Sequence, residues 1–442
     1  MSLPVLLVSL TVAAGFVFKR LRKPRHQLPL PPGPKKLPII GNLLDIPNER
    51  QWLAYHQWSQ DYDSDIIHVD ACGTSIVVVE SVEAVRELFD RRSSIYSDRM
   101  HLPMVVDLMG WDWSMAFMPY GERWRAHRKT MHDSFNVIAV KQFQSQEVHA
   151  SNELLRSLLL DPNDVVAHFR QRMDLQFLHS LSMLLRLMTI QTPQQSETVR
   201  NVAAAIYAAG ADTTAAALGW FVFAMLAYPE TQAKAQAELD AILGHGVLPT
   251  FADQQVLPYV AALVKEVLRW RTITPIAVPH FVAAEDEYRG YRIPARSIVL
   301  GNAWAILHDK VIPPQELHLL MPLKFRLIQD AYPNPDEFNP ERFLRDGKLN
   351  PKVQDPEVAV FGFGRRICPG RHMATASVWL SITSILATFK IAKAVNESGE
   401  PVEPTYDYFA GLICAPLPFK CSVMPRSLQT AEAIRSLNGH EI

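Results

Sequence analysis

The sequence predicts a mainly helical chain with a smaller part in strands. Residues 202–228 form a long, largely apolar segment, which predicts a helix that runs through the core. Helices are also expected at 51–61 and at 81–92, where Ser81 is placed to cap the N-terminus. Only a few short runs have the composition that is typical of strands.

Those runs lie near both ends of the chain. Residues 65–71 and 74–79 predict strands on either side of a turn at Gly73. Residues 405–426 predict a β-hairpin near the C-terminus. Residues 100–120 are aromatic and irregular, and predict a loop region.

The composition narrows the class of protein. The chain has 442 residues and a formal net charge of −1, which argues against nucleic acid as a partner. Its four cysteines show neither the spacing of zinc ligands nor a dense disulfide framework. Hydrophobic residues make up 48% of the chain, enough for a large core.

The N-terminus predicts a membrane anchor. Residues 2–18 carry no charge and precede a basic cluster at 19–23. Seventeen residues is the lower end of what spans a bilayer. A cleaved signal peptide is the alternative, but the basic cluster follows the apolar run and no clear cleavage site is present. The prediction is therefore an anchor at 1–18 and a basic, proline-rich hinge at 19–34, with the rest of the chain cytosolic.

The rest of the chain is organised around residues 361–371, FGFGRRICPGR. A lone cysteine is usually a small buried apolar residue. Here the run resembles the F-x-x-G-x-R-x-C-x-G haem-binding loop of the cytochrome P450 superfamily. The matching residues are Phe361, Gly364, Arg366, Cys368 and Gly370. The resemblance implies haem b, with the Cys368 thiolate as axial ligand to the iron.

The residue types in this loop suit that chemistry. Gly362 and Gly364 allow a turn that brings the sulfur close to a metal. Pro369 favours the opening of a helix, whose free N–H groups and positive end stabilise a thiolate. Arg366 offers a fixed cation to a haem propionate.

Three further residues are predicted to contact the cofactor. Trp124 and Arg128 lie four apart on a predicted helix, hence on one face. A Trp–Arg stack on a helix is commonplace, but in this order along the chain the pair resembles the family's propionate-binding helix. His280 follows residues that resemble the strand lining the substrate pocket. It is expected either to reach a propionate or to be an ordinary core or surface histidine.

The segment 209–214, AGADTT, places an acid and a hydroxyl in an apolar helix, where both are costly to bury without partners. One interpretation is a threonine that bonds back to the preceding turn and bends the helix. The segment also resembles the family's A-G-x-D-T-T motif. That resemblance implies that the bend opens a groove over the iron, where Thr213 binds oxygen and Asp212 relays protons.

Three charged residues are predicted to form a buried triad. Glu266 and Arg269 are three apart, a spacing that as a surface ion pair would contribute little. Together with Arg342 in Pro340-Glu341-Arg342-Phe343 they resemble the family's E-x-x-R and P-E-R-F elements. The resemblance implies a structural role in locking the scaffold behind the cysteine loop.

The sequence departs from the family pattern in two places. Between Trp124 and Gly210 the chain is short, so that 152–198 must replace the helices that usually roof the substrate pocket. After Asp309, residues 310–331 interpose a segment that reads as an insertion. An insertion there is expected to displace Arg342 and to weaken the fold. The alternative is that the segment loops out on the surface, in which case it is expected to be tolerated.

The resemblance implies the cytochrome P450 fold, mainly α with a small β-rich lobe, with a shortened middle region and an inserted segment. A single catalytic domain is predicted at 35–442, because the motifs spread over the chain converge on one cofactor. The sequences of residues 301–309 and 361–374 resemble those of fungal enzymes of the O-methylsterigmatocystin oxidoreductase type.

The implied reaction inserts one atom of O₂ into a hydrophobic small molecule such as a terpenoid, steroid or polycyclic aromatic. Electrons are expected from NADPH-cytochrome P450 reductase, with cytochrome b5 as an additional donor, at the endoplasmic reticulum membrane. Basic residues such as Arg365 and Arg371 are expected to attract the reductase. Two alternatives stay open: a haem-binding protein without turnover, and a haem-thiolate isomerase or dehydratase that uses no O₂.

Overall fold

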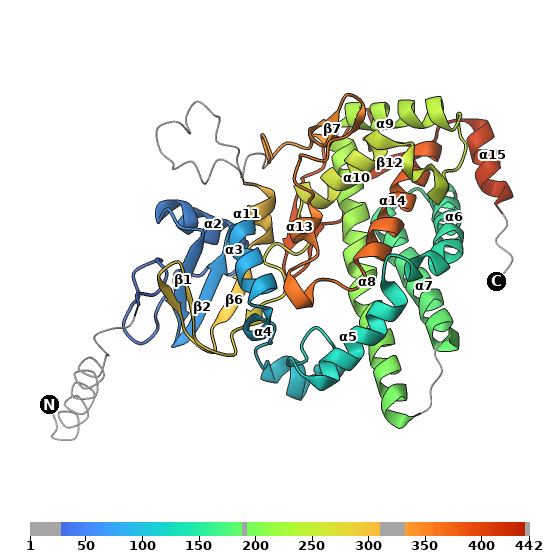
Figure 1. Cartoon of the computed structure of the whole chain (residues 1–442). Coiled ribbons are helices and arrows are strands. Elements are labelled where there is room, and N and C mark those ends of the chain that lie inside the picture. The colour runs from blue at the N-terminus through green and yellow to red at the C-terminus, as the bar shows by residue number, and fades with distance from the viewer. Residues whose placement is uncertain (1–27, 188–191, 310–331, 438–442) are drawn as a thin grey trace, which may run out of the picture.

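The computed structural model describes residues 28–187, 192–309 and 332–437 (Figure 1). The predicted anchor at 1–18, most of the predicted hinge and the predicted insertion at 310–331 lie outside these ranges. The longer helices are α2 (Gln51–Asp61), α5 (Glu122–Phe135), α6 (Gln144–Leu160), α7 (Val165–Leu187), α8 (Pro193–Ala227), α9 (Pro229–Ile242), α10 (Pro258–Trp270), α14 (Arg371–Thr388) and α15 (Leu428–Ser436).

Short helical segments connect them: α3 (Val82–Val85), η1 (Arg86–Arg91), α4 (Ser93–Tyr96), η2 (Met104–Leu108), η3 (Trp111–Trp113), η4 (Ala139–Phe143), η5 (Phe251–Gln255), α11 (Ala303–Leu307), η7 (Pro340–Phe343), α13 (Glu357–Val360) and η8 (Gly364–Arg366). The strands are β1 (Ile66–Ala71), β2 (Thr74–Val79), β3 (His280–Phe281), β4 (Asp286–Tyr288), β5 (Tyr291–Ile293), β6 (Ile298–Gly301), β7 (Leu344–Arg345), β8 (Lys348–Leu349), β9 (Phe389–Lys393), β10 (Tyr408–Ala410), β11 (Cys414–Pro416) and β12 (Cys421–Pro425).

The structure confirms the predicted fold class. A large helical part is built around α8, which contacts α5, α7, α9, α10 and α14. A smaller β-rich lobe lies beside it, with α2 and α3 nearby (Figure 1). Its main sheet has the order β1-β2-β6-β3, in which β2 and β6 are parallel and the other neighbours antiparallel.

Helix α8 begins nine residues earlier than predicted, at Pro193 instead of 202. A capping box explains the start, because Thr192 accepts a hydrogen bond from the Gln195 backbone and the Gln195 side chain bonds the Thr192 N–H. By length and composition α8 is the one described helix that could cross a membrane. Its most apolar window is 78% buried inside the protein, as expected of a core helix.

The short predicted elements are largely confirmed. Helix α2 and strand β2 match their predicted bounds, and Ser81 caps α3 by accepting a hydrogen bond from the Ala84 N–H at 3.1 Å. In the C-terminal hairpin, β10 pairs with β11 as predicted. Strand β12 pairs instead with β9, the strand that follows α14, so the prediction was wrong for this part.

The predicted charge triad is assembled and buried. Arg269 donates to both carboxylate oxygens of Glu266, at 2.7 and 2.9 Å, and Arg342 Nε donates to Oε1 at 3.0 Å. The side chains of Glu266 and Arg269 are fully buried. A charge in such a place is stabilised only when it is paired and hydrogen-bonded, and here the pairing is complete.

The triad also holds both flanks of the predicted insertion. Arg269 donates to the carbonyl oxygens of Leu307 at 3.0 Å and Pro335 at 2.8 Å. The N–H of Tyr332 donates to the carbonyl oxygen of Asp309 at 3.3 Å, so the chain resumes beside the point where residue 310 begins. The expectation that Arg342 would be displaced is wrong, because the segment leaves and returns at one point beyond the triad.

Deleting residues 310–331 and joining Asp309 to Tyr332 should leave the fold intact and raise the thermal midpoint by a few degrees at most. The two ends are already hydrogen-bonded, and removing the 22 residues between them relieves a chain-closure cost of about 3 kcal/mol or less. Circular dichroism melting and haem content measure the outcome.

Arg342→Ala serves as the contrasting variant, since it leaves Glu266 with half of its cationic partners and should cost about 3–5 kcal/mol. A deletion variant that melts as early as Arg342→Ala would show that the segment packs on the domain.

Candidate functional site

Cys368 lies between η8 and α14, whose N-terminal cap is Gly370. Its N–H donates to the carbonyl oxygen of Phe361 at 2.8 Å, which closes the loop. Burial raises the pKa of the Cys368 thiol, while the N–H of Gly370 and the charges of Arg128 and Arg371 act to lower it. Because burial dominates, a bound metal cation would be needed to keep this sulfur as a thiolate at neutral pH.

Gly362 and Gly364 of the loop differ in how closely they are packed. Gly364 has φ +57°, and a Cβ there would lie 2.1 Å from the carbonyl oxygen of Phe89. Gly362 has φ +75° with nothing within 4 Å of such a Cβ. Between them Phe363 stacks on Phe89, with ring centroids 5.4 Å apart. The loop is thus pressed against η1, and Gly364 is the residue that permits the close approach.

Arg366 is anchored by backbone carbonyls. Its guanidinium donates to the carbonyl oxygens of Ser97 at 2.8 Å, Met115 at 3.1 Å and Met118 at 2.8 Å. Burial lowers its pKa to about 10. The side chain therefore ties the cysteine loop to residues 97–118, the region predicted to cover the cofactor.

Sequence reasoning missed a second half-buried arginine, Arg99. It donates to the carbonyl oxygens of Ala116 at 3.0 Å, Val278 at 3.0 Å and Pro279 at 2.6 Å. Burial, and next the charge of Arg366, lower its pKa to about 9. No motif marks this residue, and the available signal was only a cation within an aromatic segment.

The cations outnumber the nearby acids. Arg128 donates to the carbonyl oxygen of Ile367 at 2.5 Å, and its pKa is lowered by burial. The carboxylate of Asp98 offsets Arg99 and Arg366, and accepts hydrogen bonds from the N–H groups of Arg99 and Tyr120. One carboxylate beside three half-buried guanidiniums leaves a positive excess, which suits an anionic group.

Trp124 supplies an independent test of whether that group fits. Its indole lies under Arg366, with the guanidinium carbon 4.4 Å from the ring centroid. The Trp124 Nε1 atom is buried and has no hydrogen-bond partner. Leaving such a donor unpaired costs about 1–3 kcal/mol. The orphaned indole N–H and the positive excess both fit the propionate side of a haem.

His280 lies in the core beside the same cluster. Its Nδ1 donates to the carbonyl oxygen of Tyr96 at 2.7 Å, and its ring is 4.4 Å from that of Phe89. Burial, and next the charge of Arg99, hold the pKa of His280 well below its usual range. Both causes act in the absence of an anionic partner, so the expected contact of His280 with a propionate stays a prediction.

The two residues predicted for the oxygen site, Thr213 and Asp212, both lie on helix α8 but differ in their exposure. The Thr213 hydroxyl donates to the carbonyl oxygen of Ala209 at 2.8 Å, as the structural interpretation predicted. Asp212 is exposed, which corrects the expectation of a buried acid. The reason is that α7 and α8 are joined by residues 188–192 alone, a link too short to add a helix over this face.

The glycine of this segment fixes the packing of α7 on α8. A Cβ at Gly210 would lie 2.4 Å from the ring of Phe177 on α7. Thr214, one turn along, is buried, and its hydroxyl has no partner. The two helices are therefore in close contact at the level of the AGADTT segment.

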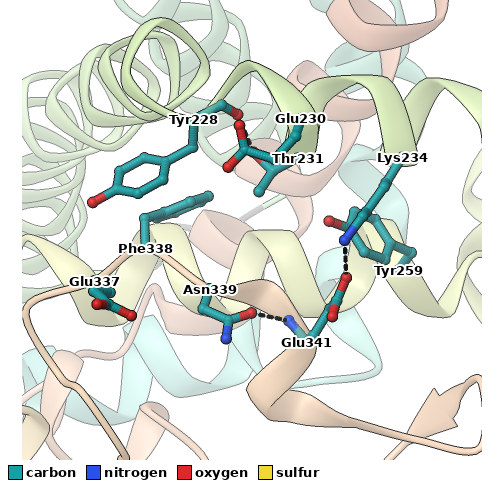
Figure 2. A pocket seen from close by; sticks show the side chains of 9 residues that line it. All are labelled: Tyr228, Glu230, Thr231, Lys234, Tyr259, Glu337, Phe338, Asn339 and Glu341. Carbon is teal, nitrogen blue, oxygen red and sulfur yellow. Dashed lines mark hydrogen bonds and ion pairs between the residues drawn. The ribbon is translucent and has the colours of Figure 1, made fainter.

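A pocket of about 220 Å³ lies between the start of α9, the start of α10 and residues 337–341 (Figure 2). It is lined by Tyr228, Glu230, Thr231, Lys234, Tyr259, Glu337, Phe338, Asn339 and Glu341. Figure 2 shows Lys234 paired with Glu341 across one side of it. None of these residues belongs to the predicted cofactor site, so this pocket is separate from Cys368.

Gly364→Ala should disrupt the site far more than Gly362→Ala. Both substitutions place a side chain at positive φ, which costs about 1–2 kcal/mol, but only the first also collides with the Phe89 carbonyl. Haem content and thermal midpoint of the two variants are the measurements. Equal losses would show that backbone strain, and not contact with η1, is what demands glycine at 364.

The chain resembles known proteins over most of its length. A family model described as Cytochrome P450 matches residues 31–159, 163–315 and 319–423. Its two interruptions fall within 152–198 and 310–331, the segments that the sequence singled out. The chain is 39% identical to Cytochrome P450 monooxygenase 98 of Postia placenta, covering 97% of this chain and 96% of that protein.

Other relatives give the same result. The chain is 36% identical to Cytochrome P450 monooxygenase ple1 of Rhodocybe pseudopiperita (98% and 96% covered). It is 33% identical to Tryptamine 4-monooxygenase of Psilocybe cyanescens (98% and 100% covered). The alignment with the Postia placenta protein spans 521 positions, so at least 79 of them have no residue in this 442-residue chain.

A solved structure shares the fold. The structure titled as a zebra fish cytochrome P450 with abiraterone superposes with a TM-score of 0.68 at 23% identity. The match covers 85% of this chain and all of that one. The finer resemblance to the O-methylsterigmatocystin oxidoreductase type stays a prediction.

Proposed function

Because the chain belongs to the cytochrome P450 family, we propose that this monooxygenase oxidises a hydrophobic small molecule of terpenoid, steroid or polycyclic aromatic type. The observation that carries the haem assignment is the orphaned Trp124 N–H under the guanidinium of Arg366, which belongs to the same loop as Cys368. One oxygen atom of O₂ enters a C–H bond, and the other leaves as water with two electrons and two protons.

The family's haem b, bound through the Cys368 thiolate, supplies the activation of O₂. Trp124 and Arg128 would hold its propionates. Arg366, which lies over Trp124, and Arg99, whose charge acts on Arg366, would add positive charge. Phe361, Gly364 and Gly370 shape the turn that presents the sulfur. The triad of Glu266, Arg269 and Arg342 holds the scaffold behind this turn.

Thr213 and Asp212 are the residues for proton delivery. The Thr213 hydroxyl hydrogen is held by the Ala209 carbonyl, so its oxygen lone pairs face outward as acceptors. Asp212 is in contact with solvent and can collect protons from it. The hydroxyl can therefore accept a hydrogen bond from a protonated group at the oxygen site, while Asp212 exchanges protons with water.

Electrons would come from NADPH-cytochrome P450 reductase, with cytochrome b5 as an additional donor. Exposed Arg365, which bonds the Tyr120 hydroxyl, and Arg371, beside the Cys368 carbonyl, support docking on the cysteine-loop face. The apolar residues 2–18 support attachment to the endoplasmic reticulum membrane.

The shortened middle region is the reason to keep haem binding without turnover as a second candidate. Only residues 188–192 join α7 to α8, and Asp212, within α8, is exposed. Product formed only with NADPH and reductase supports the proposal. Haem binding with no product favours the second candidate, and product without O₂ favours an isomerase or dehydratase.

Cys368→Ser should abolish the red-shifted Soret band of the reduced carbon monoxide complex, because a neutral hydroxyl cannot donate electrons as a thiolate does. Cys421→Ser is the matched control and should keep the band. Retention of the band in Cys368→Ser would remove Cys368 as the ligand.

Thr213→Ala should keep haem while releasing peroxide in place of product, with coupling reduced about 10²-fold or more, in the range typical of a lost proton-transfer group. Thr214→Val is the control, because it removes a buried hydroxyl that bonds nothing. NADPH consumed, product and peroxide are measured together. Equal coupling in the two variants would withdraw the role of Thr213.

A further inference from the structure

Arg271 is a cation without an acceptor. It directly follows α10 and is half-buried, and its Nε atom is buried with no hydrogen-bond partner. Among the described residues, no carboxylate forms an ion pair with its guanidinium. A buried donor on a charged group is unfavourable when it stays unpaired. Arg271 thus differs from Arg269, two residues earlier, whose guanidinium pairs with Glu266.

Aromatic rings surround the guanidinium of Arg271. Its central carbon lies 4.6 Å from the ring centroid of Trp270, and 6.0 Å from those of Trp220 and Tyr408. Each indole N–H donates to a backbone carbonyl oxygen, at 2.8 Å for Trp270 and at 3.1 Å for Trp220. These bonds fix both rings, so Arg271 stacks on a rigid platform while its Nε donor stays unpaired.

A second arginine approaches the same group of rings. The guanidinium carbon of Arg50 lies 4.6 Å from the ring centroid of Tyr408. Arg50 precedes α2, beside the β-rich lobe, whereas α10 belongs to the helical part (Figure 1). The charge of Arg50 acts against that of Arg271, because the two cations are close. In the part of the chain that the structure describes, Arg50 has no carboxylate partner either.

The position of Arg50 leaves a helix without a side-chain cap. Arg50 is the N-cap residue of α2, with φ +52°, and its side chain makes no capping hydrogen bond. Aspartate or asparagine would tolerate this backbone conformation and could accept a hydrogen bond from the first turn. The arginine instead brings a second unpaired cation to the ring that the first one approaches. Two like charges in such a place point to an anion from outside the chain.

We propose that Arg271 and Arg50 bind the carboxylate of an organic molecule at the junction of the β-rich lobe and the helical part. The Nε atom and one terminal nitrogen of Arg271 would donate to the two carboxylate oxygens as a fork. Arg50 would supply the second charge. The apolar body of the ligand would lie against the half-buried ring of Tyr408.

The surroundings favour a carboxylate over inorganic phosphate. A planar carboxylate matches one edge of a guanidinium, and Arg271 has such an edge with its Nε atom unpaired. The aromatic rings beside it offer apolar contact. An organic acid can use that contact, whereas a hydrated phosphate cannot.

This site is additional to the oxygen site. Trp220 follows Thr213 by seven residues on α8, which is about 10 Å along the helix axis. Arg50, Arg271 and Tyr408 do not belong to the residues predicted to hold haem or to deliver protons. The proposal therefore goes beyond the monooxygenase reaction and does not rest on it.

Benzoate is the probe, and isothermal titration calorimetry of the full, haem-loaded chain at constant ionic strength measures its binding. Benzamide has the same shape without the charge and should bind at least tenfold more weakly, as should inorganic phosphate, which makes no apolar contact. Equal or tighter binding of benzamide or of phosphate would overturn the proposal. The absence of benzoate binding would overturn it as well.

Variants of the two arginines locate the bound probe. Arg271→Gln should raise the dissociation constant of benzoate about tenfold or more, and Arg50→Gln about threefold or more. Arg271→Lys keeps the charge but lacks the fork, so it should also bind more weakly. Arg435→Gln, which removes an exposed arginine on α15, is the matched control and should change nothing. Exposed Arg50 keeps the test valid if Arg271→Gln does not fold.

Unchanged dissociation constants in the variants of Arg271 and Arg50 would contradict the proposal. The Soret band distinguishes this site from the haem pocket, because benzoate at Arg271 should leave the band as it is. A shift of the band that follows the heat of binding and persists in Arg271→Gln would place the probe over the iron, and would also overturn the proposal. None of these measurements uses NADPH, reductase or product, so their failure is distinct from failure of the proposed function.

Discussion

One buried carboxylate holds together parts of the chain that are far apart in sequence. Glu266 is fully buried and receives hydrogen bonds from two arginines and from the N–H of Asn339. Arg269, fixed by this carboxylate, reaches carbonyls at Leu307 and Pro335 on either side of the segment 310–331. The ion pairs that neutralise this one buried charge therefore also fix the chain on both sides of residues 310–331, at the end of α11 and where it resumes at Tyr332.

The two arginines of the predicted cofactor site are also each held by several partners. Arg366 and Arg99 have few carboxylates near them, and each guanidinium is instead occupied by three backbone carbonyls. Burial lowers the pKa of both side chains, yet each remains a cation at neutral pH. The protein thus keeps positive charge close to Cys368 in a form that an anionic ligand can use.

The sequence predicts the local elements and the motifs better than the tertiary surroundings. Strand β2 and helix α2 could be located because composition and turn signals are local. The triad could be located because Glu266, Arg269 and Arg342 match motifs of the family that the sequence resembles. The exposure of Asp212 could not be foreseen, because it depends on how α7 and α8 are joined. Arg99 was missed for a related reason. Its partners are carbonyl oxygens, and any residue supplies a carbonyl, so no sequence pattern marks them.

The carbonyl contacts of Arg366 have a consequence for which substitutions the site can accept. They join the cysteine loop to Ser97, Met115 and Met118 through main-chain oxygens. Every residue type supplies such an oxygen, so the side chains at these three positions can change while the link to Arg366 stays. A change of backbone conformation between residues 97 and 118 has the opposite effect, because it withdraws the acceptors and leaves the guanidinium of the cysteine loop without partners.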